Sequence, residues 1–411
     1  MTSLRLSAPL LSARIDSELL ASTLAKLLGS GNAACKADLV RVTGLSRTTV
    51  DTGIRLLLEH SVIRRAGFRQ TSGRGRSAEL LELSPDYGYV LVADCSAHMA
   101  QLGVFDLNQK ELSSSSVRYE LSEGPQKVLG AIVAEFLRLL DELPHSAVVT
   151  VMGLPGPVDN RSGTVVRPPI MPGWDGFPIA QFVGTALECQ VVLENDVNLR
   201  ALGEARAIGP LSGPLLYVKV STGIGAGIVT ANGELMHGAD GSAGDIGHIK
   251  LASQDRPCVC GNNGCLEAVA SAAALTRRMI GAPYTAAVDG ADIDRLLERI
   301  NAGDPEALAN LKEAAQYVGE AIANLVHVLN PSRIVIGGML ANAGDDLLAT
   351  VRGIVYQRAL PLATRELTVG KPLLGVRSGM AGGLITGIER ALSPDSLNAH
   401  INLGKGLENI A

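Results

Sequence analysis

The segment from His237 to Glu267, HGADGSAGDIGHIKLASQDRPCVCGNNGCLE, combines a metal-binding pattern with polar residues typical of a ligand site. Three of the six cysteines of the chain lie together in it, and two glycines stand between the last two thiols, where wrapping around an ion needs a permissive backbone. One imidazole and three thiolates make a closed tetrahedral set, which suits structural zinc because no position is left open for a substrate. The alternative is three free buried thiols and an ordinary histidine. The predicted zinc ligands are His248, Cys258, Cys260 and Cys265.

The composition predicts a globular protein of two or three domains. Its 411 residues exceed an ordinary single domain, and with 46% apolar but only 3% aromatic residues the cores must be aliphatic. No uninterrupted apolar run reaches the length of a membrane helix, and the beginning, MTSLRLSAPLLSARIDSELL, lacks the hydrophobic segment and cleavage site of a secretory signal. We therefore expect a cytoplasmic protein without a membrane partner, in which reducing conditions favour metal binding over disulfides.

Charge is distributed unevenly along the chain. Residues 1–84 contain twelve Lys or Arg and seven Asp or Glu, a balance of +5, and the remainder carries −10 because the whole chain has a net charge of −5. A basic segment joined to an acidic body predicts that the N-terminal part binds a polyanion.

Two helical patterns with a glycine between them predict a helix-turn-helix in this basic segment. The sequence CKADLVRVTGLSRTTVDTGIRLLLEH (residues 35–60) contains a short helix, a break at Gly44 and a longer helix that Ser46 caps. A helical hairpin without a DNA role is the alternative. On the exposed face of the second helix, five side chains suit phosphates and base edges in a major groove: Arg47, Thr48, Thr49, Thr52 and Arg55.

A wing is predicted after these helices. Residues 62–65 and 78–83 have strand patterns on either side of QTSGRGRS (residues 70–77), a basic glycine-rich tip. Arg74 and Arg76 in this tip suit a narrow minor groove or phosphates. The second helix also carries Asp51, which repels phosphate unless it accepts a hydrogen bond from a cytosine or a neighbouring arginine. The predicted partner is double-stranded operator DNA.

His248 and CVCGNNGCLE (residues 258–267) resemble the signature of the ROK family, which comprises repressors, uncharacterised reading frames and sugar kinases. The resemblance covers essentially the whole chain. It implies a winged helix-turn-helix domain over residues 1–84 and an α/β actin-like (ribonuclease H-like) ROK domain with two lobes over residues 85–411. The small lobe then comprises about residues 85–196 plus the C-terminal helix, and the large lobe about residues 197–375.

The resemblance also implies a sugar site between the lobes. His248 would bind zinc through one ring nitrogen and a sugar hydroxyl through the other, so that the metal fixes its tautomer. Asp245 stands where the family usually has glutamate, and its shorter side chain predicts a different sugar, a phosphorylated sugar or a bridging water. The positions that match the family's sugar contacts are Asn195, Asp196, Asp245, His248 and Glu267.

The two phosphate loops of the family's kinases are preserved unequally. The first has the form Asp-x-Gly-Gly-Thr in the kinases, but here Asp94 is followed by CSAH (residues 95–98), whose side chains keep backbone amides away from a phosphate. The second keeps its form in TGIGAG (residues 222–227). In the kinases the aspartate at the position of Asp196 is the general base that takes the proton of the attacking sugar hydroxyl.

Three hypotheses follow from these observations. The first is a sugar-responsive transcriptional regulator, a repressor without enzymatic activity, with a sugar or sugar phosphate as effector and zinc as a structural cofactor. The second is a kinase that transfers phosphate from ATP to a hexose with Asp196 as base. The third is a regulator whose effector is a partner protein or no sugar at all. The first accounts for both ends of the sequence, and we expect it to act as a homodimer, or a dimer of dimers, on two half-sites.

Overall fold

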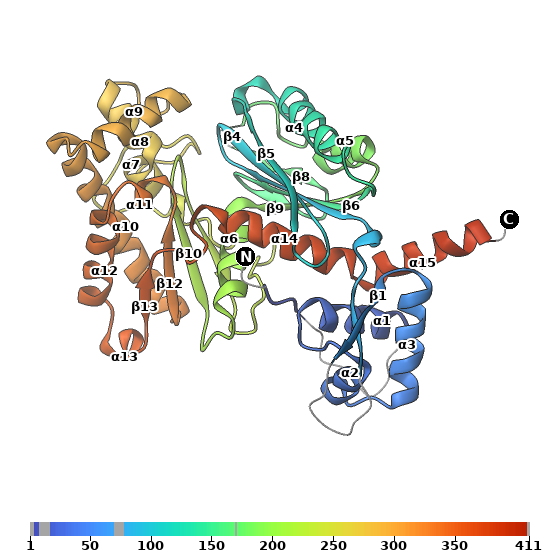
Figure 1. The fold of residues 1–411 in the computed structure, drawn as a ribbon. Helices are drawn as coiled ribbons and strands as arrows, with labels where there is room; N and C mark the ends of the chain where they lie inside the picture. The colour runs from blue at the N-terminus through green and yellow to red at the C-terminus, as the bar shows by residue number, and fades with distance from the viewer. Residues whose placement is uncertain (1–3, 8–16, 70–77, 169–170, 409–411) are drawn as a thin grey trace.

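The computed structural model describes residues 4–7, 17–69, 78–168 and 171–408. A head of helices and a two-stranded ribbon precedes a body of two lobes, each of which has its own sheet (Figure 1). A winged helix-turn-helix followed by a two-lobed α/β body confirms the predicted fold class. Within the described part of the chain, no helix is both long and apolar enough to cross a membrane.

The head has the predicted winged helix-turn-helix arrangement. Gly44 ends the second helix in the left-handed conformation, with φ of 69°, and donates its amide to the carbonyl of Val40. The hydroxyl of Ser46 accepts the amide of Thr49 and caps the third helix. The first wing strand extends to Arg69, beyond its predicted end, and pairs antiparallel with the second. The elements of the head are α1 (Ser17–Gly29), α2 (Lys36–Thr43), α3 (Arg47–Glu59), β1 (Ile63–Arg69) and β2 (Ala78–Leu83).

The small lobe is built on a five-stranded sheet with the order β5-β4-β3-β6-β9. Because β3, β6 and β9 run parallel, their carboxyl ends meet at one edge, and Asp94, Gly153 and Glu194 stand in register there. Helices α4 and α5 cover the outer face (Figure 1). The elements are β3 (Tyr89–Cys95), β4 (Met99–Phe105), β5 (Glu111–Arg118), α4 (Pro125–Leu140), β6 (Ala147–Leu154), β7 (Val158–Asp159), β8 (Thr164–Val165), α5 (Ile179–Leu187) and β9 (Gln190–Asn195).

The large lobe is built on a four-stranded sheet with the order β11-β10-β12-β13. Strand β10 pairs antiparallel with β11 and parallel with β12, and the turn between β10 and β11 is the predicted second phosphate loop. The elements are β10 (Leu215–Val220), β11 (Ile224–Val229), α7 (Leu266–Ala270), α8 (Ala272–Ile280), α9 (Gly290–Asn301), α10 (Pro305–Leu329), β12 (Arg333–Gly337), α11 (Met339–Asn342), α12 (Asp346–Arg358), α13 (Pro361–Thr364) and β13 (Thr368–Gly370).

Two helices, α6 (Asp196–Ile208) and α14 (Ser378–Ala391), lie between the sheets and pack against each other (Figure 1). Small residues allow the close approach. A Cβ at Gly203 or Gly382 would overlap backbone atoms of the facing helix, so neither position accepts a side chain without separating the pair. Helix α14 also covers β3 and β6, so it connects the small lobe to α6.

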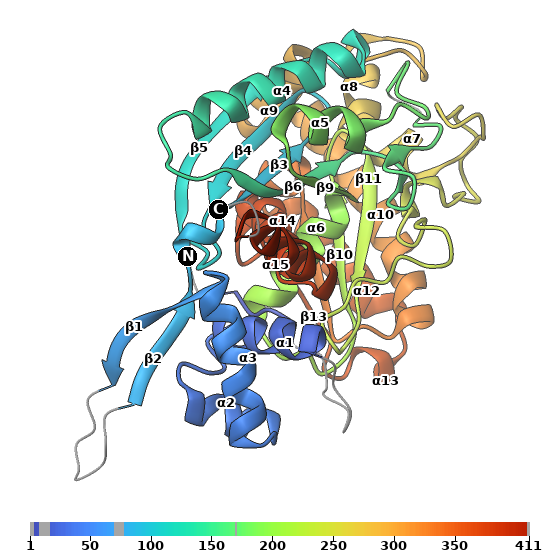
Figure 2. The same ribbon diagram turned by 90° about the vertical axis from the view of Figure 1, so that its right-hand side faces the viewer.

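The head is fixed to the body by both ends of the chain. Helix α15 (Pro394–Glu408) follows α14 and packs against α1 (Figure 2). The hydroxyl of Ser22 on α1 donates to the carbonyl of Leu392 at 2.6 Å. At the other end of the chain, the side chain of Gln109 exchanges two hydrogen bonds with the backbone of Leu4, at 2.7 and 2.8 Å. Apolar side chains of the head and of α14 therefore share one hydrophobic core.

Candidate functional site

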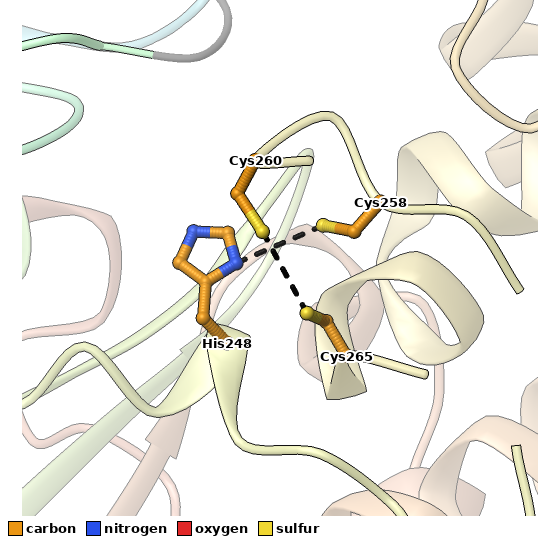
Figure 3. A group of neighbouring side chains, drawn as sticks. All are labelled: His248, Cys258, Cys260 and Cys265. Atoms are coloured by element: carbon orange, nitrogen blue, oxygen red, sulfur yellow. Dashed lines mark hydrogen bonds between the residues drawn. The ribbon is translucent and has the colours of Figure 1, made fainter. Parts of the chain in front are cut away.

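Four potential metal ligands converge between β11 and α7 (Figure 3), and they are the predicted set of His248, Cys258, Cys260 and Cys265. Their ligand atoms all lie within 4.8 Å of one another. Sγ of Cys260 is 3.7 Å from Sγ of Cys265, and Sγ of Cys258 is 3.7 Å from Nδ1 of His248. A tetrahedron around zinc with bonds of about 2.3 Å has edges of about 3.8 Å, so this donor set fits the ion.

Short backbone turns bring the thiols together. The amide of Cys258 donates to Asn262 at 2.8 Å, and the amide of Gly261 donates back to Cys258 at 3.0 Å. Gly264 has φ of 75°, and a Cβ there would press on the carbonyl of Gln254, so this turn requires glycine. Burial raises the pKa of the Cys258 thiol to about 12, and the thiolate that a metal needs would form only as the ion displaces the proton.

His248 connects the metal ligands to the predicted sugar contacts of the large lobe. Its Nδ1 faces the thiols, while its Nε2 lies 3.9 Å from Oδ1 of the half-exposed Asp245. Glu267 accepts the amide of Ile224 at 2.9 Å and so lies against the turn between β10 and β11. Burial raises the pKa of Glu267. The structure thus brings Asp245, His248 and Glu267 together.

The other two predicted contacts lie where β9 ends and α6 begins. Oδ1 of Asn195 accepts the amides of Val197 and Asn198 at 2.9 and 3.2 Å, and its Nδ2 donates to the carbonyl of Gly156 at 3.0 Å. Asn195 is therefore a helix cap and a connection to the segment after β6. Asp196 is the first residue of α6, and it is buried.

Two internal ion pairs occupy the carboxylate of Asp94, in the predicted first phosphate loop, and that of Asp196, the predicted sugar contact. Lys219 on β10 donates to Asp196, and Nη2 of Arg200 on α6 donates to both oxygens of Asp94 at 2.8 and 3.0 Å. Burial alone would lower the pKa of Arg200, but the charges of Asp94 and Asp196 outweigh burial and raise this pKa. Asp196 therefore already has a cationic partner before any sugar hydroxyl reaches it.

The turn between β3 and β4 closes on itself where the kinases have phosphate-binding glycines. Both the amide and the hydroxyl of Ser96 donate to the carbonyl of Met99 at 2.8 Å. Nδ1 of His98 lies 2.7 Å from the carboxylate of Glu120, and the ring packs against Gly290 at the start of α9. The side chains that replace the glycines thus make contacts of their own.

A histidine and a glutamate connect the two lobes beside this site. Nε2 of His237, on the segment after β11, lies 2.7 Å from Oε2 of Glu194 at the end of β9. Nδ2 of Asn198 also donates to Glu194 at 2.9 Å. The hydrogen bond that His237 donates to Glu194 raises the pKa of His237. Burial would raise the pKa of Glu194, but its partners outweigh burial and lower it.

In the head, α3 presents most of its predicted DNA-facing side chains to solvent. Arg47, Thr48, Thr52 and Arg55 are exposed, whereas Thr49 is partly covered and shares a hydrogen bond with the hydroxyl of Ser46. Asp51 lies 2.5 Å from Nζ of Lys36 and 3.6 Å from Arg55, so neighbouring cations compensate its charge. Arg74 and Arg76 lie outside the described residues.

The comparison with known families decides the identity. The sequence profile of the ROK family matches residues 91–387. The chain belongs to the ROK family. The match covers both lobes, α6 and nearly all of α14.

ROK proteins similar to this chain include repressors and kinases. The xylose repressor of Caldicellulosiruptor bescii is 26% identical over 87% of this chain and 92% of its own length. The glucokinase of Halalkalibacterium halodurans is 34% identical, over 56% of this chain and 73% of its own length. The crystal structure of a ROK family transcriptional regulator, a homologue of the Escherichia coli Mlc protein, aligns over 94% of this chain and 98% of its own with a TM-score of 0.74 at 23% identity, which shows a common fold.

Sequence reasoning missed four residues of this ROK site: Glu194, Arg200, Lys219 and His237. A signal existed for Lys219, because a lysine interrupts the otherwise apolar strand LLYVKV. Arg200 follows Asp196 by one helical turn and faces the same way, which the spacing also indicates. Glu194 and His237 lie far apart in sequence, and only the folded chain brings them together.

Proposed function

We propose that this ROK protein is a sugar-responsive transcriptional repressor that binds operator DNA through α3 and the wing and a sugar between its lobes. One combination of features carries the proposal. A helix-turn-helix head is joined to a body in which Asp94 of the first phosphate loop and Asp196 at the general-base position are both paired with internal cations. Relatives that match most of the chain carry the name repressor, including Mlc of Escherichia coli at 24% identity over 89% of this chain. Such a body senses a sugar without phosphorylating it.

The exposed face of α3 supplies the chemistry for reading DNA. The guanidinium of Arg47 stands at the first turn of the helix, and threonine hydroxyls follow it along the exposed face. An arginine in the major groove donates to O6 and N7 of guanine, and hydroxyls serve base edges or phosphates. Arg74 and Arg76 of the wing tip are assigned to phosphates or the minor groove. A homodimer, or a dimer of dimers, places two heads on two half-sites.

The effector site combines groups from both lobes around a zinc-bound histidine. His248 would hold zinc through Nδ1, which faces the thiols, and its Nε2 would then be free to donate to a sugar hydroxyl. Asp245 and Glu267 provide acceptors from the large lobe, while Asn195 and Asp196 stand at the small-lobe side. Zinc held by the four ligands keeps this part of the large lobe rigid and supplies no catalytic step.

The kinase alternative rests on the glucokinase relatives and on the glycines of the second phosphate loop. Two contacts argue against it. Lys219 already pairs with the carboxylate of Asp196, and the side chains of the β3–β4 turn stand where the kinases have a phosphate-binding amide loop. ATP turnover that is lost in Asp196→Asn would restore the kinase assignment.

Helix α6 offers the physical route from sugar to DNA. It begins at Asp196 in the effector site and ends beside the chain terminus that supports the head. In its last turn Arg206 donates to the carbonyl of Arg5 at 3.4 Å and pairs with Glu389 of α14 at 3.2 Å. Leu6, next to Arg5, is buried and packs near Gly29 of α1. A sugar that closes the lobes would shift α6 and so change the position of the head, provided that it binds the two states with different affinity.

Selection of duplexes from a random DNA library with the purified chain, followed by anisotropy titrations of the selected duplex, tests the proposal. Arg47→Ala should weaken binding of the selected duplex by about 1–3 kcal/mol if its side chain reads a base pair. Arg295→Ala on α9 is the matched control, because Arg295 is an exposed arginine like Arg47 and lies outside the head. Equal affinities of the two variants, or the absence of any selected sequence, would contradict the proposal.

A further inference from the structure

Four charged side chains form a compact group where α6 and β10 meet the end of β3. Asp94 and Asp196 provide two negative charges, and Arg200 and Lys219 provide two positive charges. All are largely buried, with side-chain exposures of 3% and 2% for the aspartates, 16% for Arg200 and 14% for Lys219. We call these residues the charge quartet. Its formal charge is zero, and every member already has a partner of opposite sign.

From the charge quartet we infer that the effector is an uncharged sugar and that Lys219 is a specificity-determining contact. The inference rests on the proposed function and specifies its ligand class. The proposed function places a sugar hydroxyl against Asp196, at the small-lobe side of the effector site. A phosphate on that hydroxyl carries about −1.5 to −2 charges at neutral pH and would meet the two buried aspartates. It would turn a neutral group into an anionic one in a place that water reaches poorly.

Three neighbouring groups of the charge quartet, among the residues that the structure describes, do not compensate a phosphate. The adjacent amide and hydroxyl of Ser96 are both engaged by the carbonyl of Met99, so this turn does not offer them to a phosphate. The nearby His237 is engaged by Glu194. On the large-lobe side the half-exposed side chain is another carboxylate, Asp245. Phosphate sites in proteins rely on free backbone amides and unpaired cations, and the groups of Ser96 and His237 are already committed.

A neutral hydroxyl suits the same geometry. A hydroxyl donates one hydrogen bond and accepts others, and the Lys219–Asp196 pair offers both functions at adjacent atoms. The ammonium of Lys219 has three donors, of which Asp196 uses one, so it can donate to the hydroxyl while Asp196 accepts from it. Lys219 comes from β10 of the large lobe and Asp196 from the start of α6, so one hydroxyl would be held by groups of two elements that are already in contact.

Calorimetric titration of the full chain with pairs of ligands tests the inference. The ligands are glucose, mannose and N-acetylglucosamine, each with its own 6-phosphate, together with xylose. At least one free sugar should bind, and a 6-phosphate should bind at least about tenfold more weakly than its parent sugar, because like charges repel in the site. A 6-phosphate that binds more tightly than its parent would overturn the inference and leave the proposed function standing. Failure of every sugar and every phosphate to bind would overturn both.

Two variants separate specificity from folding. Asp196→Asn gives the charge quartet a net positive charge, so the ratio of phosphate to free-sugar dissociation constants should fall at least about tenfold. Lys219→Met gives it a net negative charge and should weaken free sugars as well, through the lost donor. Asp345→Asn, at a surface carboxylate that is 87% exposed, is the control and should leave the ratio unchanged. An unchanged ratio in Asp196→Asn, in a variant that melts cooperatively, would contradict the role of the charge quartet.

Discussion

Replacing one metal ligand tests how much the Cys3His set stabilises the body. Cys260→Ser is the appropriate change, because Cys260 is only partly buried and a serine there reaches water instead of leaving a cavity. A metal bound to both His248 and Cys265 would cross-link the segment of residues 248–265. Closing a loop of roughly 15 residues contributes about 3 kcal/mol through the lost freedom of the unfolded chain. At about 2–4 °C per kcal/mol for a domain of this size, the variant should melt about 6–12 °C below the wild type.

The assay combines scanning calorimetry with a colorimetric measurement of zinc released by a thiol reagent. Wild-type protein should release about one zinc ion per chain, whereas Cys260→Ser should release much less and should bind sugar more weakly, because Nε2 of His248 loses its fixed orientation. Cys189→Ser is the control, since Cys189 is equally partly buried and its partner Thr150, at 3.2 Å, can bond a serine hydroxyl. A zinc-free wild type, or equal melting temperatures of the two variants, would refute the structural role of the metal.

Three further predictions use contacts elsewhere in the chain. The pKa of His237 is raised above 6.5 and that of Glu194 is lowered below 4.5, so the stability from their ion pair is complete between pH 4.5 and 6.5. This stability is lost as pH rises through the folded-state pKa of the histidine or falls through that of the glutamate. The melting temperature of His237→Gln should therefore vary less with pH in both ranges, and a pH profile equal to that of the wild type would exclude the pair. Gly382→Ala should cost about 1–3 kcal/mol or more in urea unfolding, because its Cβ meets α6, whereas Gly353→Ala, with open space around it, should stabilise α12 slightly; equal effects would contradict the close helix contact. Asp51→Asn should raise the affinity for random duplex and steepen its salt dependence by up to about one unit, and an unchanged slope would place this residue away from the phosphates.

Local chemistry made much of the head and the metal site predictable. The turn between α2 and α3 needs the left-handed backbone that Gly44 adopts, and Ser46 is a strong helix cap, so both could be located without tertiary contacts. The three thiols lie within one short segment, which limits how they can be arranged around an ion. Only His248 has to be brought to them, from the short helical turn Ile246–His248 that precedes the thiols in the chain.

The charged contacts of the body could not be located in the same way. Asp94 and Arg200 are 106 residues apart, and Glu194 and His237 are 43 apart, so only the packing of two sheets against α6 brings these pairs together. The predicted C-terminal helix corresponds to α14, and the further helix α15 was not expected, because the sequence after α14 carries no strong apolar pattern and the position of α15 depends on packing against α1. Long-range packing therefore decides which carboxylates are free and which are neutralised.

Titration of the selected duplex with and without a saturating sugar that raises the melting temperature is the most direct test of the central claim. If sugar binding between the lobes shifts α6 and the head, the DNA dissociation constant should change at least about fivefold, the lower end of typical coupling between sites. An unchanged DNA dissociation constant, with the sugar demonstrably bound in the same sample, would contradict the account.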